Sequence, residues 1–596
     1  MTTRKEFENR TEALNQPVIQ LDRNDELKVG WDEIGAFISQ LVLTATKDDK
    51  KPVCAIGIDG YVGTDWPATI ERLETALDER GIRSAFLNAE DCLKPEQEID
   101  EILLPYLGDD PVFGRLYKKG LKSLFDSKRL AALRANLRKL SRQRGVAQPQ
   151  VIVCYGTGAL INTLRPLYDF TIYVDLTRET VLKRNRKWSQ LAGKTQSIGP
   201  KKLYYVDFQT NDRHRKRLLN RLDFYIDGNN SPILFSALTL QKITTALASW
   251  PFKLKYMYEP GPWGGQWLKK IRHLPDDWVN CAWSYEVIAQ EMSLLVAVKG
   301  TTVELPWTTF FCLQYDRVMG NVPKRRFGGE FPIRYDYLDT MDGGDLSIQV
   351  HPTTPYIREQ FGEHYHQGEM YYIVAAREGA TVNLGLNEET KRGEFWQAAT
   401  LADKEGIAFD YRDYVNNVPV KKHDLLLIPP GTVHGSGTGV VVLEISATTY
   451  RYTFKIYDHL RPDLNGVMRP IHIKHAFDVI KWFRRSKWVA RNLKQEPRLI
   501  RSGDGWAEYL IGDRREFFHV VFLLEFDSQI EDDTEGNFHI LALVEGASVE
   551  LYALQDREKK LAFNYSETII VPACFGKYRI VNQGEGACKI AKARLR

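Results

Sequence analysis

The sequence lacks long hydrophobic runs, and none approaches the ~18 consecutive apolar residues that a membrane-spanning helix needs. Its first residues, MTTRKEFENRTEALNQ, are charged and lack the apolar core of a secretory signal. Hydrophobic residues make up 43% of the chain and charged residues 27%, which is ordinary for a soluble protein. We therefore expect a cytoplasmic protein with no membrane partner.

Cysteines are also scarce, and no two of them stand close together. The chain has seven, an odd number, spread over its whole length. This distribution predicts reduced thiols and argues against a CxxC zinc site or a disulfide framework. Any bound metal must then be held by histidine together with oxygen ligands.

An excess of charge of one sign is missing as well, because the net charge is only +4. The basic runs LRANLRKLSRQR and IKWFRRSKWVARNLK are more typical of solvated helix faces than of a nucleic-acid groove. We expect no nucleic-acid partner, whereas anionic small molecules stay possible. The oligomeric state is left open.

The chain of 596 residues is too long for one hydrophobic core, since domains usually contain ~100–200 residues. Strand-like runs such as VCAIGIDG and FTIYVDL alternate with helical segments in the first part, which predicts an α/β domain with a parallel sheet. Later runs such as VVVLEISATTY and ETIIVPA are short and separated by turn residues, which predicts β-sandwiches. The expected domains are residues 1–245, 246–470 and 471–596.

Four residues in the second part could form a metal site. Gln349 and His351 stand two apart in the strand-like SIQVHP, so they point to the same face. Glu369 opens the next apolar run, EMYYIV, and His434 follows a Pro-Gly turn that could direct it back across the sheets. This mixed oxygen and nitrogen set suits Zn²⁺ or another divalent first-row metal with one open position. The alternative is that each residue is an ordinary hydrogen-bonded group of the core or rim.

The same segments resemble the signature segments of type I mannose-6-phosphate isomerases, which are zinc-dependent cupin enzymes. The matching stretches are PWGGQWL, LSIQVHPTTPYI, GEMYYIV, LLIPPGTVHGSGTGVVVLEIS and FKIYDHLRPD. The resemblance covers roughly residues 255–596 and implies an all-β jelly-roll fold. It also implies one zinc ion per chain, held by Gln349, His351, Glu369 and His434, and interconversion of mannose 6-phosphate and fructose 6-phosphate.

Catalytic candidates follow from the resemblance and from the chemistry of an enediolate reaction, which needs a base near C1 and C2. Glu444 matches a family position implicated in catalysis, and His366 is the rival base. Lys455 stands where the family has arginine, and Arg461 keeps a family-like position for contact with an anion. Gln367 replaces a lysine that the family often has two residues before the glutamate ligand. These departures leave the identity of the sugar phosphate open.

The segment GIDGYVGTDWP near the N-terminus resembles the phosphate-binding loop of uridine-kinase-like phosphotransferases. A working loop needs a lysine for the phosphates and a Ser or Thr for Mg²⁺, but these positions hold Trp66 and Pro67. Tyr155 replaces an expected acidic residue. The groups that could still contact a phosphate are Gly57, Gly60, Gly63, Arg184 and Arg186. We expect a P-loop-kinase-like fold that serves as a scaffold or regulatory pocket and does not transfer phosphate.

Two functions are therefore consistent with the sequence. The first is a metal-dependent isomerase of a sugar phosphate, favoured because all four ligand positions are present. The second is a regulatory protein that senses a sugar phosphate, with a lapsed isomerase cupin and a pseudokinase domain. The substitutions at Gln367 and Lys455 favour this second function or a changed substrate.

Overall fold

The computed structural model describes residues 16–21, 23, 25–47, 53–142, 150–187, 199–449 and 451–596. It divides into two compact units. The N-terminal unit comprises Val18–Ala246 and Gln290–Gln314, and the C-terminal unit comprises Leu247–Ala289 and Tyr315–Arg596 together with Gln16 and Pro17. Within the described residues, no helix is long and apolar enough to cross a membrane. The predicted three-domain boundaries stay a prediction.

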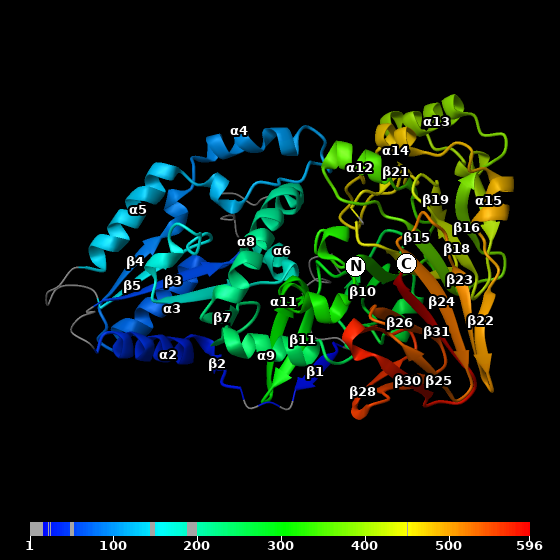
Figure 1. Ribbon diagram of the computed structural model, residues 1–596. Coiled ribbons are helices and arrows are strands. Elements are labelled where there is room, and N and C mark those ends of the chain that lie inside the picture. Colours follow the sequence, from blue (N-terminus) through cyan, green and yellow to red (C-terminus); the bar gives the residue numbers. More distant parts are fainter. Residues whose placement is uncertain are drawn as a thin grey trace. The chain divides into compact units, whose positions relative to one another are not determined.

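A seven-stranded sheet forms the centre of the N-terminal unit (Figure 1). The strand order is β2-β8-β7-β6-β3-β5-β4, and the strands from β7 to β4 are parallel. The strands are β2 (Lys28–Val29), β3 (Cys54–Gly60), β4 (Ser84–Asn88), β5 (Val151–Tyr155), β6 (Phe170–Asp175), β7 (Phe224–Asp227) and β8 (Ile233–Ser236). The predicted α/β fold with a parallel sheet is confirmed for this unit.

Helices cover both faces of this sheet (Figure 1). Ile38 of α2 and Leu73 of α3 join the apolar core on one face, and Leu130 and Leu137 of α5 join the core on the other. The helices are α2 (Gly30–Ala45), α3 (Trp66–Asp78), α4 (Glu96–Leu107), α5 (Ser127–Leu140), α6 (Arg178–Lys187), α7 (Pro200–Lys202), α8 (Gln209–Leu218) and α9 (Ala237–Leu247).

The segment 290–314 returns to the N-terminal unit although it lies far along the chain. It supplies β11 (Ser293–Val298) and β12 (Thr301–Pro306), which form a three-stranded sheet with β1 (Val18–Leu21). It ends within α11 (Trp307–Met319). This segment reaches the carboxyl ends of the parallel strands, because the Glu304 backbone N–H donates to Asp227 at 2.7 Å and the Thr309 hydroxyl donates to Asp175.

The C-terminal unit begins with a β-sandwich of a six-stranded sheet, order β18-β15-β20-β13-β10-β9, and a five-stranded sheet, order β17-β16-β19-β14-β21. Its strands are β9 (Met257–Glu259), β10 (Trp283–Val287), β13 (Ile333–Asp339), β14 (Ile348–Val350), β15 (Glu369–Ala376), β16 (Thr381–Leu386), β17 (Val415–Pro419), β18 (Leu425–Ile428), β19 (His434–Ser436), β20 (Val440–Ala447) and β21 (Phe454–Tyr457). Its helical insertions are α10 (Trp267–Ile271), α12 (Thr354–Phe361), α13 (Arg392–Glu405), α14 (Ile473–Val479) and α15 (Ser486–Asn492). We call this part the first β-sandwich.

A second β-sandwich follows in the same unit, with sheets of order β22-β23-β24-β31-β26-β29 and β25-β30-β27-β28. Its strands are β22 (Arg498–Gly503), β23 (Trp506–Gly512), β24 (His519–Phe526), β25 (Gln529–Asp533), β26 (His539–Glu545), β27 (Ser548–Ala553), β28 (Asp556–Asn564), β29 (Thr568–Val571), β30 (Lys577–Asn582) and β31 (Cys588–Leu595). Residues along β27 alternate between half-buried and buried, which is the pattern of a strand with one face on the core. In the first β-sandwich, by contrast, all eight residues of β20 are buried, because both faces of this strand are covered.

Candidate metal centre and active site

Three side chains that can bind a metal converge inside the first β-sandwich. His351 Nε2 lies 2.9 Å from Glu369 Oε1, and His434 Nε2 lies 3.2 Å from Glu369 Oε2. One possible ligand atom of each residue lies within 4.8 Å of the other two. All three residues are buried, so their convergence is part of the interior and not of a solvated surface.

The strand registers explain this convergence. In the five-stranded sheet, His434 of β19 pairs with Gln349 of β14, which pairs on its other side with Lys455 of β21. Directly paired residues of antiparallel strands point to the same face, so these three form a row. His351 stands two residues after Gln349, on the same face. Glu369, the first residue of β15, reaches the row from the six-stranded sheet.

Both imidazoles are held by the nitrogen that faces away from the centre. His351 Nδ1 lies 3.2 Å from the carbonyl oxygen of Tyr452, and His434 Nδ1 lies 2.9 Å from that of Thr432. A carbonyl oxygen only accepts, so each Nδ1 carries a hydrogen, and the second nitrogen, Nε2, faces Glu369 at the centre. Nε2 is therefore the atom of each ring that is placed to bind a metal.

Gln349 completes the predicted set of four. Its amide nitrogen lies 3.4 Å from His434 Nε2, and its Oε1 accepts from the Ser347 hydroxyl at 2.9 Å. The oxygen and nitrogen of an amide exchange places by a half-turn of the group. That half-turn directs Oε1 towards His434 and makes it available as a ligand.

The donor set fits a divalent metal. His351 Nε2 and Glu369 Oε2 are buried, and their close polar neighbours are atoms of the other candidate ligands, at 2.9 and 3.2 Å. Burial alone would raise the pKa of Glu369, but His351 and His434 hold that pKa well below its usual value. The buried Gln367 amide donates to Glu369 Oε1. Two imidazoles, a carboxylate and an amide oxygen are ligands that suit Zn²⁺ and its first-row neighbours.

Glu444 lies on the same sheet face as Glu369. The register places Glu369 opposite Ser446, which stands two residues after Glu444. Arg334 donates to Glu444 at 3.2 Å and to Asp336 at 3.0 Å, and all three side chains are buried. Burial and the carboxylates of Asp336 and Glu369 raise the pKa of Glu444 well above its usual value, although Arg334 opposes the shift. Glu444 is therefore a proton-binding group beside the metal ligands.

His366 is held by protein partners at both ring nitrogens. Nδ1 lies 2.7 Å from the Thr354 hydroxyl, and Nε2 lies 2.9 Å from the carbonyl oxygen of Glu516. The carbonyl requires a hydrogen on Nε2, so Nδ1 accepts from Thr354. Burial lowers the pKa of His366 to about 4, and the ring stacks on Phe518 at 4.8 Å. The neutral ring has no lone pair left for a substrate.

Three cations surround one buried carboxylate next to the row of Gln349 and Lys455. Asp458 is 3.5 Å from Lys455, 3.2 Å from Arg461 and 2.9 Å from Arg469. Burial lowers the pKa of Lys455 to about 8, and Arg469 acts in the same direction. The three cations around Asp458 are placed to attract an anion. Arg469 was not among the residues predicted from sequence, because it lies in an irregular segment without a strand pattern.

In the N-terminal unit, the segment that resembles a phosphate-binding loop is closed by its own side chains. Trp66 is only 6% exposed and packs against Tyr155, with ring centroids 5.9 Å apart. A Cβ atom on Gly60 would lie 2.6 Å from the Thr64 hydroxyl and 2.9 Å from Trp66, so no space remains above this glycine. Pro67 stands in the first turn of α3, where its missing N–H is tolerated.

Paired charges fill the carboxyl edge of the parallel sheet, where open α/β sheets bind ligands. Arg215 donates to both Asp175 and Asp212 at 2.7 Å. Arg178 donates to Asp212 at 2.8 Å and to Glu291 at 2.9 Å. These arginines already have carboxylate partners, so they are poorly placed to receive a nucleotide phosphate.

Arg184, one of the two arginines expected to contact a phosphate, contacts backbone carbonyls. It donates to the carbonyl oxygens of Gly63 at 3.1 Å and Gly228 at 2.7 Å. Burial lowers its pKa. The side chain of Arg186 lies outside the described part of the structure.

Comparison with known proteins separates the two parts of the chain. Residues 30–249 match the model of a domain of unknown function, DUF8485. The mannose-6-phosphate isomerase of Streptococcus mutans is 30% identical over 223 residues, which cover 37% of this chain and 64% of the relative, a little less than two thirds of its length. The probable mannose-6-phosphate isomerase GmuF of Bacillus subtilis is 28% identical over 346 residues, 57% of this chain and 97% of the relative.

One solved structure covers a similar share of this chain. The mannose 6-phosphate isomerase from Bacillus subtilis covers 58% of this chain and 99% of its own, with 19% identity and a TM-score of 0.45. The C-terminal region of the protein is thus similar in sequence to mannose-6-phosphate isomerases.

Proposed function

We propose that the C-terminal unit is a metal-dependent aldose–ketose isomerase that interconverts mannose 6-phosphate and fructose 6-phosphate with one zinc ion per chain. The observation that carries the proposal is the buried centre of His351, Glu369 and His434, with both imidazoles turned so that Nε2 faces the centre. The similarity of this region to mannose-6-phosphate isomerases supports the same activity.

The reaction moves a proton between C1 and C2 of the sugar through an enediolate. A divalent ion at the centre would act as a Lewis acid on the carbonyl and hydroxyl oxygens of the substrate. We assign the base to Glu444, because its raised pKa strengthens a carboxylate as a proton acceptor and because it lies on the same sheet face as Glu369. The neighbouring Arg334 then compensates the charge changes during the transfer. His366 is the weaker candidate, since both of its nitrogens are already engaged.

The phosphate of the substrate is assigned to the cations around Asp458. Lys455, Arg461 and Arg469 all lie around Asp458, so three cations can attract a phosphate at this place. Lys455 and the ligand Gln349 are paired across β21 and β14, which connects the phosphate group to the metal centre through adjacent strands. A lysine offers a point charge where arginine offers a planar fork, so phosphate geometry here need not match that of relatives.

For the N-terminal unit we propose a relative of the P-loop kinases that does not transfer phosphate. The proposal is supported by the parallel strand order β4-β5-β3-β6-β7, by the loop that follows the central strand β3 and by the closure of that loop. Segment 290–314 adds contacts to Asp175 and Asp227 at the edge where a nucleotide would bind. This unit then serves as a scaffold.

A panel of hexose and pentose phosphates tests the proposed isomerase. Purified full-length protein is incubated with each sugar phosphate, with and without added zinc, and the product is identified by NMR. The proposal predicts metal-dependent formation of fructose 6-phosphate from mannose 6-phosphate. Binding of sugar phosphates without turnover of any of them would establish the sensor function in its place.

A further inference from the structure

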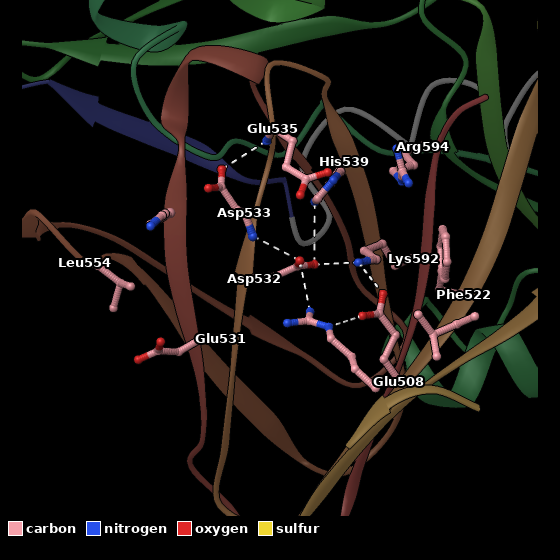
Figure 2. A pocket seen from close by; sticks show the side chains of 13 residues that line it. Glu508, Phe522, Glu531, Asp532, Asp533, Glu535, His539, Leu554, Lys592 and Arg594 are labelled. Atoms are coloured by element: carbon pink, nitrogen blue, oxygen red, sulfur yellow. Dashed lines mark hydrogen bonds and ion pairs between the residues drawn. The ribbon is translucent and has the colours of Figure 1, made fainter. Parts of the chain in front are cut away.

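The second β-sandwich contains a polar cavity of about 420 Å³ between its two sheets (Figure 2). The inner face of β31 is apolar at Ile590 and continues, two residues at a time, to Lys592 and Arg594, which line the cavity. Likewise, Leu541 of β26 belongs to the core, whereas His539 on the same face lines the cavity. The interior of this sandwich therefore changes from hydrocarbon to charged groups towards one end.

A compensated network forms the floor of the cavity. Lys592 contacts Glu508 at 2.6 Å and Asp532 at 2.5 Å, and it is only 3% exposed. Arg501 contacts Asp532 at 3.0 Å and also binds Glu508. Figure 2 shows Asp532 at the centre of these contacts. Burying charges costs several kcal/mol per ion even in relaxed proteins, so a core that needed only stability would be expected to use apolar side chains here.

Two groups on one wall of the cavity have unused capacity for a ligand. Arg594 is half-buried, packs over the Phe522 ring at 5.6 Å and forms no ion pair with any described residue. His539 is 2% exposed; its Nδ1 lies 2.8 Å from the Tyr578 hydroxyl, which donates its own hydrogen to Asp532 at 3.1 Å. Nδ1 therefore donates to Tyr578, and Nε2 carries a lone pair that can accept a hydrogen bond. Figure 2 shows both side chains at the same side of the pocket.

His539 is neutral in this cavity. Burial lowers the pKa of His539 to about 3, and Lys592, Arg594 and Arg501 lower it further, although Asp532 opposes the shift. Arg594 is therefore the group on this wall that can attract an anion.

The other wall offers acceptors for hydroxyl groups. Asp533 and Glu535 line the cavity from the end of β25 and the turn that follows it. Neither carboxylate has a cationic partner in the described part of the chain; Asp533 accepts only from the backbone N–H of Glu535, at 3.0 Å. Carboxylates in this state can accept hydrogen bonds from a polyhydroxylated molecule.

We propose that this cavity is a second ligand site, separate from the metal centre, which binds a phosphorylated sugar. The phosphate contacts Arg594, and the sugar hydroxyls donate to His539 Nε2, Asp533 and Glu535. The volume lies at the lower end of the ~300–1,000 Å³ that is usual for small-molecule pockets, which fits a monosaccharide phosphate. Ligand binding in this cavity does not depend on isomerase activity, so this proposal is independent of the function proposed above.

Calorimetric titration of the metal-loaded full-length protein with fructose 6-phosphate, inorganic phosphate and fructose tests the proposal. The probe variant is Arg594→Ala, and the matched control is Arg557→Ala, which removes an exposed arginine of β28 outside the cavity. Arg594→Ala removes one charge-assisted hydrogen bond to the phosphate. Fructose 6-phosphate and inorganic phosphate should therefore bind roughly ten- to hundredfold more weakly in the cavity, whereas binding at the metal centre stays unchanged. Isomerisation by the variant is expected to be unchanged in kcat and KM.

A second variant separates recognition of the sugar from recognition of the phosphate. Asp533→Asn should weaken fructose 6-phosphate at this site and leave the affinity for inorganic phosphate within about threefold. The proposal is overturned if Arg594→Ala binds fructose 6-phosphate as the control does, or if fructose binds as tightly as its phosphate. If the metal centre itself binds no sugar phosphate, wild type shows one site and Arg594→Ala shows none, so failure of the isomerase assignment is recognised separately.

Discussion

Each imidazole at the metal centre supplies one of very few bonds to the metal, and this makes the ligand assignment testable one residue at a time. His351→Ala or His434→Ala should lower metal content from about one ion per chain to near zero, because removing a ligand usually costs far more affinity than removing its supporting partner, which costs ~10–100-fold. Metal content is measured by mass spectrometry after gel filtration. His423→Ala is the control, since His423 binds Tyr372 and Glu545 away from the centre. Full metal content in a variant that carries both His351→Ala and His434→Ala would refute the assignment.

Glu444 is tested by a substitution that keeps its shape. Glu444→Gln should lower kcat by ~10²–10⁴, the usual contribution of a general base, with metal content unchanged. Exchange of the C2 proton of mannose 6-phosphate with D₂O, followed by NMR, should slow by a similar factor. Normal turnover in this variant would exclude Glu444 as the base and return the assignment to His366, which His366→Gln then tests in the same assay.

Loss of the Lys455 charge at high pH should make substrate binding depend on pH. Its pKa of about 8 means that the side chain loses its charge as the pH rises above 8, so attraction for the phosphate weakens and KM should increase between pH 8 and pH 9.5. Lys455→Arg keeps its charge over this range and should flatten the rise. The measurement is KM for mannose 6-phosphate against pH in both proteins, and equal slopes would contradict the role of Lys455.

At this residue scale, strand periodicity was enough to place Gln349 beside His351, because side chains two apart share a face. The turn before His434 was also visible in the sequence. The partners of Glu444 and His366 could not be predicted from the sequence. Arg334 comes from a strand 110 residues away, and Glu516 lies 150 residues from His366. Pairings over such separations depend on the sheet order and not on any local pattern.

At the scale of the elements, the second β-sandwich combines an apolar core with a charged end, and the balance of charges there determines its stability. Lys592→Met leaves Glu508 and Asp532 with one shared cation, Arg501, so the free energy of unfolding should fall by ~3–5 kcal/mol, as for other broken buried ion pairs. Lys560→Met removes an exposed lysine that pairs with Glu550, and it should change stability by less than ~1 kcal/mol.

Urea unfolding monitored by tryptophan fluorescence measures both variants, because Trp506 packs against the core of this sandwich. Equal midpoints for Lys592→Met and Lys560→Met would show that the buried network contributes no stability. The alternating pattern of β27 could be predicted from sequence. The charged end of the sandwich could not be predicted from sequence. Without the sheet order, Lys592 and Arg594 on β31 could equally belong to a solvent-facing row.

At the scale of the whole molecule, the expectation of an α/β unit followed by β-sandwiches is confirmed, because alternation of strands and helices is a long-range pattern that survives local error. The return of residues 290–314 to the N-terminal unit was not foreseen. Those residues read as two ordinary β-strands and the start of a helix, and nothing in their composition indicates which unit they join.

This return underlies the prediction for the N-terminal unit. With Trp66 in the core and Asp175 and Asp227 bonded to segment 290–314, the full-length protein should bind Mg-ATP no more tightly than roughly millimolar and should phosphorylate neither nucleosides nor sugars. Calorimetry and radiolabelled ATP measure the two quantities. Micromolar binding together with phosphoryl transfer would make the protein a bifunctional kinase and isomerase.

The central claim is that the buried centre of His351, Glu369 and His434 carries out metal-dependent isomerisation. The most direct measurement is the rate of conversion of mannose 6-phosphate to fructose 6-phosphate by one preparation of the full-length protein before chelation, after removal of the metal and after addition of one equivalent of zinc. The account predicts turnover, loss of turnover and its recovery, and no recovery in His351→Ala. Turnover that is unchanged by removal of the metal, or absent from the metal-loaded protein, would contradict it.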